Sequence, residues 1–268
     1  MKVLDRQSFA LDFQDVVLRS SKRDASFFTP PWNLQIRRGD KVAVMSKDRN
    51  LRDEFLGSLC GLIQSVSGQI NSRCTISWPV GLKGGLEGKL TLAQNVQFLE
   101  VVYEDRVAPA DPKKFFESFC LLAGLSPDQK LKSLKSKEQK LFYNIVPFIF
   151  SFDVLLVPSA EYLFKGNDDN LSQFLNQIFE KRIEKACMIT SSNNKKFLKQ
   201  YCNVGLVFDS LGCLAFQGPI DECLAYKKSL SSETDDSDND DDMVDESVFS
   251  EKLSNEGPGV DFELIDLI

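Results

Sequence analysis

Short apolar runs alternate with longer amphipathic segments along the first 228 residues. The runs at 9–18, 32–36, 41–45, 153–157 and 187–190 have the length and composition of strands, and 204–218 has the pattern of a hairpin. The segments 51–63, 113–123, 137–150 and 169–184 have helical spacing. Phe55, Leu59 and Leu62 then share one helical face, and only a polar turn is expected between the first two strands. This alternation predicts an α/β domain with a mixed sheet, an antiparallel edge and helices over both faces.

The charge of the chain is divided unevenly. Residues 229–268 contain 14 Asp and Glu and the single Lys252, whereas residues 1–228 contain 25 acids and 31 bases. A segment this acidic buries too little apolar surface to offset its ordering entropy, so we expect a disordered tail after a domain at 1–228.

A group of lysines gives the body its own charged surface. They stand at positions 113, 114, 132, 135, 137 and 140, with no aromatic platform between them, so a solvated helical face is expected and nucleic acid is not. An alternative is that the acidic tail folds back on this basic surface and competes with a partner there, through a contact that salt would weaken.

The last twelve residues, GPGVDFELIDLI, alternate apolar and acidic positions. Such a segment suits docking to a protein partner, either as an added strand or in a groove. The candidate contact residues are Phe262, Leu264, Ile265, Leu267 and Ile268. An uneventful solvated tail remains the other interpretation.

Cysteine and histidine usage argues against metal chemistry. The chain has seven cysteines with no CxxC pair and no histidine, so we expect no metal site and reduced core thiols in a cytoplasmic protein. No stretch reaches the roughly 18 to 20 apolar residues that span a bilayer. Any contact with a membrane is therefore expected to come through a partner.

The stretch ISWPVGLKGGLEGKLTLAQNVQF, residues 76–98, combines a Gly-rich loop with Thr91 as a predicted helix N-cap. It resembles the nucleotide-binding subunits of ATP-binding cassette (ABC) exporters of capsular polysaccharide, teichoic acid and related glycans, and the resemblance covers about residues 9–228. It implies a P-loop NTPase-like cassette domain with an antiparallel subdomain and a helical subdomain at about 100–150.

The phosphate loop of that family is altered here. Such a loop needs glycines so that backbone amides converge on the phosphates, a lysine for the β and γ phosphates, and a hydroxyl for Mg²⁺. Against the family pattern, the sequence SKDRNLRD places Ser46, Arg49 and Leu51 at the glycines, Arg52 at the lysine and Asp53 at the hydroxyl. We therefore expect neither ATP nor Mg²⁺ to bind.

The other catalytic positions implied by the resemblance are also altered. Pro158 and Ser159 stand where the family has the Mg²⁺-binding Asp and the catalytic Glu, and Asn193 stands at the switch histidine. The signature loop keeps Ser136 but has Lys137 in place of the following glycine. Proline offers no side-chain acceptor and a serine hydroxyl is a very poor base, so we expect the chain not to be an enzyme.

The resemblance leaves a binding role. Trp78 and Phe98 fall in the neighbourhood that receives the coupling helices of the membrane subunit, although core packing explains both aromatics equally well. We expect a scaffolding or regulatory subunit of a surface-polysaccharide export or synthesis system, peripheral to the inner membrane and present as a monomer or a dimer. Its expected partner is an active ABC ATPase, a permease or a glycan synthase. The alternative is the silent half of a heterodimeric transporter ATPase, paired with an active cassette.

Overall fold

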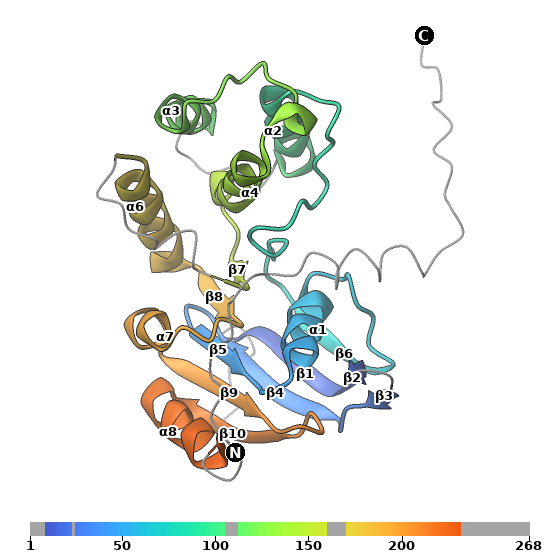
Figure 1. Cartoon of the computed structure of the whole chain (residues 1–268). Helices are drawn as coiled ribbons and strands as arrows, with labels where there is room; N and C mark the ends of the chain where they lie inside the picture. The colour runs from blue at the N-terminus through green and yellow to red at the C-terminus, as the bar shows by residue number, and fades with distance from the viewer. Residues whose placement is uncertain (1–8, 23–24, 105–111, 160–169, 232–268) are drawn as a thin grey trace.

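The computed structural model describes residues 9–22, 25–104, 112–159 and 170–231. Figure 1 shows two lobes, with sheets below and a group of helices above. Across these described ranges, no helix is both long and apolar enough to cross a membrane.

The central sheet has five strands. They are β5 (Lys41–Met45), β7 (Val154–Val157), β8 (Cys187–Thr190), β9 (Val204–Phe208) and β10 (Leu214–Pro219), in the order β10-β9-β5-β8-β7. The first four run parallel, and β10 pairs antiparallel with β9. The predicted mixed sheet with an antiparallel edge is confirmed.

The strands of this sheet are buried on both faces. In β5, Ala43 and Met45 enter a core shared with the helical lobe, whereas Val42 and Val44 enter a core shared with a second sheet. Two apolar faces require an unbroken apolar run, which is why KVAVM showed no alternation with polar residues.

The second sheet is antiparallel. Its strands are β1 (Phe9–Val17), β4 (Trp32–Arg37) and β6 (Ser67–Ser72), in the order β4-β1-β6. Helix α1 (Arg49–Leu59) packs against its inner face, where the rings of Phe13 and Phe55 stack with centroids 5.4 Å apart. The polar turn expected between the first two strands was wrong, because the segment forms a hairpin of β2 (Arg19–Lys22) and β3 (Ala25–Phe28).

Helix α1 is shorter than predicted. It ends at Leu59, and Leu62 lies outside it with 38% of its surface exposed. Gly61 adopts a φ of +77°, a left-handed conformation that glycine adopts without strain and that does not continue a right-handed helix. Phe55 and Leu59 are buried, but the predicted face does not extend to Leu62.

The upper lobe contains α2 (Leu92–Val102), α3 (Pro112–Ala123), η3 (Leu131–Ser133), α4 (Ser136–Ile145) and η4 (Val146–Ile149). Thr91 is the N-cap of α2, as predicted, and forms a capping box with Gln94. The single helix expected at 137–150 is divided: α4 ends at Ile145, and a 3-10 turn containing Pro147 follows. Proline lacks the N–H that would continue the α-helical bonding.

The described residues after β7 form three more helices. They are α6 (Asn170–Lys185), α7 (Lys195–Tyr201) and α8 (Ile220–Ser231), and α8 packs on β9 and β10 (Figure 1). The predicted docking segment, with Phe262, Leu264, Ile265, Leu267 and Ile268, lies outside the described residues.

Candidate nucleotide site

The loop between β5 and α1 lies at the carboxyl end of the central sheet, where open α/β sheets bind ligands. Ser46 is buried, and its Oγ accepts from the backbone N–H of Asp48 at 3.2 Å. Asp48 is the N-cap of α1, and its Oδ1 accepts from the N–H of Asn50 at 3.0 Å. The positive end of the helix dipole therefore already holds a carboxylate of the same chain.

Arg52 points inward. Only 6% of the residue is exposed, and its Nη1 donates to the backbone oxygen of Ser191, just beyond β8, at 3.1 Å. Its neighbour Asp53 is 12% exposed in its side chain and lies 3.7 Å from Nε of Arg49. These charged groups contact the chain itself, and Leu51 beside them is fully packed in the core.

The end of β7 carries neutral groups. Pro158 directly follows the strand, and its backbone oxygen accepts from Oγ of Ser191 at 3.3 Å. Ser159 is buried, with 7% exposure. Neither residue offers a carboxylate to a metal ion or to water.

The predicted switch and signature positions lie in different parts of the structure. Asn193 follows β8 and accepts through Oδ1 from Nζ of Lys227 at 3.1 Å. The carboxyl edge of the sheet thus carries the residues after β5, β7 and β8 together. Ser136 and Lys137 lie apart from them, exposed at the first turn of α4 in the helical lobe.

The two aromatic candidates have different environments. Trp78 is partly buried in an aromatic cluster, stacked on Tyr103 with centroids 5.7 Å apart and edge-on to Phe152 at 5.8 Å. Phe98 is 50% exposed. Val101 and Val102, at 72% and 52% exposure, follow it at helical spacing along α2 and extend one apolar face.

The sequence is similar to proteins of known role. The polysialic acid transport ATP-binding protein KpsT of Escherichia coli is 29% identical over 199 residues, which span 74% of this chain and 89% of KpsT. This chain is thus similar, over about three quarters of its length, to ATP-binding proteins of capsule polysaccharide export. The capsule polysaccharide export ATP-binding protein CtrD of Neisseria meningitidis is 22% identical to this chain, over 74% of this chain and 88% of CtrD. No family model matches the sequence.

Solved structures show the same fold. An ATP-binding subunit of an ABC transporter superposes on the cassette with a TM-score of 0.63 and 15% identity, covering 82% of this chain and 93% of that subunit. A bacterial Atm1-family ABC exporter with ATP bound gives a TM-score of 0.60 and 16% identity, covering 87% of this chain and 43% of the exporter. The predicted ABC ATPase architecture is confirmed.

Sequence reasoning missed the contacts that occupy this edge. In the sequence, Lys47, Arg49 and Arg52 alternate with Asp48 and Asp53, which predicts a self-neutralised surface loop rather than an anion site at the helix N-terminus, and the Arg49–Asp53 pair fits that prediction. Arg52 does not, because its acceptor Ser191 is 139 residues away. A Ser or Asp immediately before a helix is the one local signal of capping, and Asp48 gives it.

Proposed function

We propose that this chain is a cassette subunit that neither binds nor hydrolyses ATP and that acts as a binding, scaffolding or regulatory subunit in a bacterial surface-polysaccharide export or synthesis system. The observation that carries the proposal is the occupied α1 N-terminus, where Asp48 caps the helix and Arg52 donates to Ser191. The relatives that are named for capsule and polysialic acid export support the pathway.

The charge at the loop opposes a nucleotide. A triphosphate needs the backbone N–H groups at the start of α1, and the Asp48 carboxylate already accepts from one of them. The negative charges of the phosphates and of Asp48 would therefore lie close together and repel each other. Freeing Arg52 to reach a phosphate would leave the Ser191 oxygen without this donor in a buried place. Both effects disfavour phosphate binding.

The end of β7 opposes hydrolysis. Activation of water requires a group that takes a proton, and Mg²⁺ prefers carboxylate and water oxygens. Pro158 supplies neither, and Ser159 supplies only a buried hydroxyl. These two positions therefore provide neither a carboxylate that could bind Mg²⁺ nor a base that could take a proton from water.

The direct test is calorimetric titration of the full chain with Mg-ATP, with a chain ending at Ser231 as a parallel sample. We expect no binding up to millimolar nucleotide in either sample, and no phosphate release. Micromolar binding accompanied by hydrolysis would refute the proposal. The truncated sample shows whether residues 232–268 mask the loop.

A second function is favoured by the apolar face of α2. Phe98, Val101 and Val102 expose carbon surface on the helical lobe, which suits a partner at that lobe. The chain would then be the silent half of a transporter ATPase, paired with an active cassette and a permease. Co-purification with a permease would favour this function, and a stable soluble complex with a glycan synthase and no permease would favour scaffolding.

Substitutions test this face. The double change Phe98→Glu and Val101→Glu should abolish capture of a permease or an active cassette if the α2 face is the contact. The matched control is Leu211→Glu, which changes a side chain of 65% exposure on the sheet-rich lobe. Equal loss in both variants would show that the effect is not specific to α2.

A further inference from the structure

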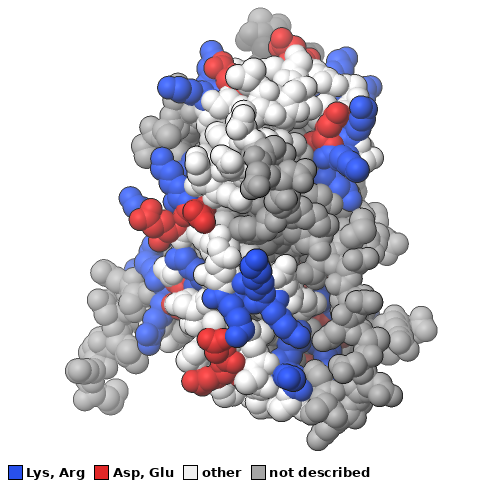
Figure 2. Space-filling model, turned by 60° about the vertical axis from the view of Figure 1, so that its left-hand side comes forward, with Lys and Arg blue, Asp and Glu red and all other residues white. Residues whose placement is uncertain are grey.

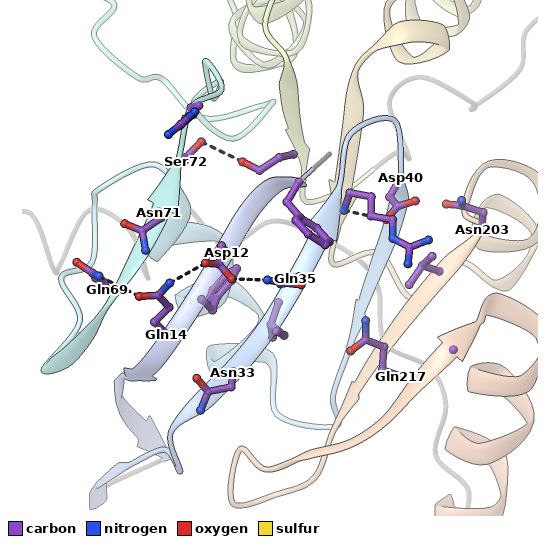
Figure 3. A pocket seen from close by; sticks show the side chains of 18 of the residues that line it. Asp12, Gln14, Asn33, Gln35, Asp40, Gln69, Asn71, Ser72, Asn203 and Gln217 are labelled. Atoms are coloured by element: carbon purple, nitrogen blue, oxygen red, sulfur yellow. Dashed lines mark hydrogen bonds between the residues drawn. The ribbon is translucent and has the colours of Figure 1, made fainter. Parts of the chain in front are cut away.

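A groove with a volume of 1580 Å³ lies on the outer face of the antiparallel sheet. Its floor is formed by β1, β4 and β6, and Asn203 with Gln217 and its neighbours on β10 forms the facing wall (Figure 3). The inner face of the same sheet is apolar and covers α1, so the groove and the candidate nucleotide site use different surfaces.

The floor of the groove has a uniform chemistry. Six of its side chains are amides or a carboxylate, two from each strand: Asp12, Gln14, Asn33, Gln35, Gln69 and Asn71. The strand register places Asp12 directly opposite both Gln35 and Asn71, and Gln14 opposite Gln69. Side chains opposite one another on a sheet face lie close enough to act on one ligand.

Hydrogen bonds hold these side chains in place. Asp12 accepts from Nε2 of Gln14 at 2.7 Å and from Nε2 of Gln35 at 2.9 Å. Gln14 in turn accepts from Nε2 of Gln69 at 3.0 Å (Figure 3). Each of these bonds uses one of the two hydrogens of a glutamine amide. Gln14, Gln35 and Gln69 therefore each keep one N–H donor and further acceptor capacity for a ligand.

The charge and polarity of the groove restrict its ligand. Asp12 and Asp40 are balanced by Arg37 and Arg73, so the groove lacks the positive excess that nucleic acid requires. Its aromatic lining is also sparse for a protein interface: of its two phenylalanines, Phe13 is buried and only Phe9 is partly exposed. Amides that both donate and accept match hydroxyl groups, which do the same.

We propose that this groove binds a segment of a polyhydroxylated glycan chain. Asp12, Gln14, Gln35 and Gln69 form the central hydrogen-bonding row, and Arg37 and Arg73 contact any carboxylate on the sugar. The proposal rests on the polysaccharide part of the proposed function, and is independent of whether the cassette hydrolyses ATP. A cassette that holds the polymer would couple export or synthesis to the presence of its product.

The test uses the full chain with two probes, a sialic acid tetramer as the acidic saccharide and maltoheptaose as the neutral one. Binding is followed by saturation-transfer NMR and by calorimetry at millimolar saccharide. We expect at least one probe to bind, and the Gln14→Ala/Gln35→Ala variant to bind it about tenfold or more weakly, since two hydrogen-bonding groups are lost. The matched control Gln173→Ala/Gln177→Ala removes two exposed amides from α6 and should bind like the native chain.

Two results would overturn the assignment: neither probe binding to the native chain, or the groove and control variants binding equally well. An Arg73→Gln variant that loses only the acidic probe would support the arginine contact. The Mg-ATP titration is read separately. If the native chain binds neither saccharide and also binds no nucleotide, the glycan groove is refuted and the inactive cassette is not. If the native chain binds saccharide and hydrolyses ATP, the inactive cassette is refuted and the groove is not.

Discussion

Nη1 of Arg52 donates to the backbone oxygen of Ser191 across 3.1 Å, which ties the first turns of α1 to the end of β8. Arg52 stands where the resemblance places the phosphate-binding lysine, and in this structure its side chain is bound by the protein itself. The same contact fixes the distance between two elements that border the carboxyl edge of the sheet.

The Arg52→Met variant tests that role. It should lower the free energy of unfolding by about 1–3 kcal/mol, because the buried Ser191 oxygen loses a charged donor. Urea unfolding measures the change. Arg49→Met is the matched control, since its side chain is 41% exposed and its surface pair with Asp53 should contribute less than about 1 kcal/mol. Equal losses in the two variants would contradict the structural role of Arg52.

Gly68→Ala should be strongly destabilising. Gly68 has a φ of +72°, and an added Cβ would collide with the backbone of Asp15 across the β1–β6 pair. Both the left-handed backbone and the collision oppose alanine, so we expect a loss of about 2 kcal/mol or more in urea unfolding. Gly85→Ala is the control, because nothing lies within 4 Å of its added Cβ. A Gly68→Ala variant as stable as the control would show that the backbone around Gly68 and Asp15 shifts to accept the added methyl group.

The buried thiols should react slowly and make stability fall at high pH. Burial raises the pKa of Cys60 to about 11 and the pKa values of Cys120, Cys187 and Cys202 to about 12. Unfolded thiols ionise at about 8.5, so their contribution to stability is complete below that pH and is lost as the pH rises toward the folded values.

Two measurements follow from the thiols. Urea unfolding at about pH 9.5 should show a lower free energy of unfolding than at about pH 7.5. Alkylation of the buried Cys120, Cys187 and Cys202 in the native chain should be about tenfold or more slower than in the unfolded chain. Rapid native labelling of Cys120 or Cys202 would contradict the burial. The partly exposed Cys74 and Cys213 serve as internal references.

The acidic tail should bind the body in trans. Lys and Arg side chains occur over both lobes on the face shown in Figure 2, with smaller acidic groups between them. Residues 232–268 carry 14 acids and Lys252, so their removal changes the net charge from −7 to +6. A peptide of residues 232–268 should bind the chain ending at Ser231, with an affinity that falls as salt is added.

The lysines that the sequence singled out give this prediction its control. Replacing Lys132, Lys135 and Lys137 by Glu should weaken peptide binding, and replacing Lys195, Lys196 and Lys199 tests whether α7 is used instead. Binding that ignores both salt and these substitutions would rule out an electrostatic contact of the tail with the body.

The parts of the fold that the sequence predicted have strong local signals. The runs VAVM and VLLV predicted strands because side chains that enter a core on both faces of a sheet are all apolar, and Thr91 with Gln94 forms a capping box that the local sequence predicts. The β2–β3 hairpin gave no such signal, because RSSK and ASFF lack the alternation of a half-buried sheet. Its neighbour α1 supplies the packing instead.

The candidate sites were predictable only in part. The resemblance could assign residues to the positions of the phosphate loop, but where their side chains lie is decided by long-range contacts such as that of Arg52 with Ser191. The groove was missed because Asp12, Gln14 and Gln35 read as the ordinary solvent-facing positions of alternating strands. Their convergence depends on the register of three strands that are distant in sequence.

Strand β7 stands at one edge of the central sheet, yet its outer side is not bare. The backbone of 75–80 runs along it: Val154 donates to Thr75, Ser77 donates to Val154, and Val80 donates to Leu156. An apolar edge such as VLLV would otherwise offer a template for another chain. The segment that leads to the helical lobe therefore also occupies the edge of β7 at which another chain could otherwise add a strand.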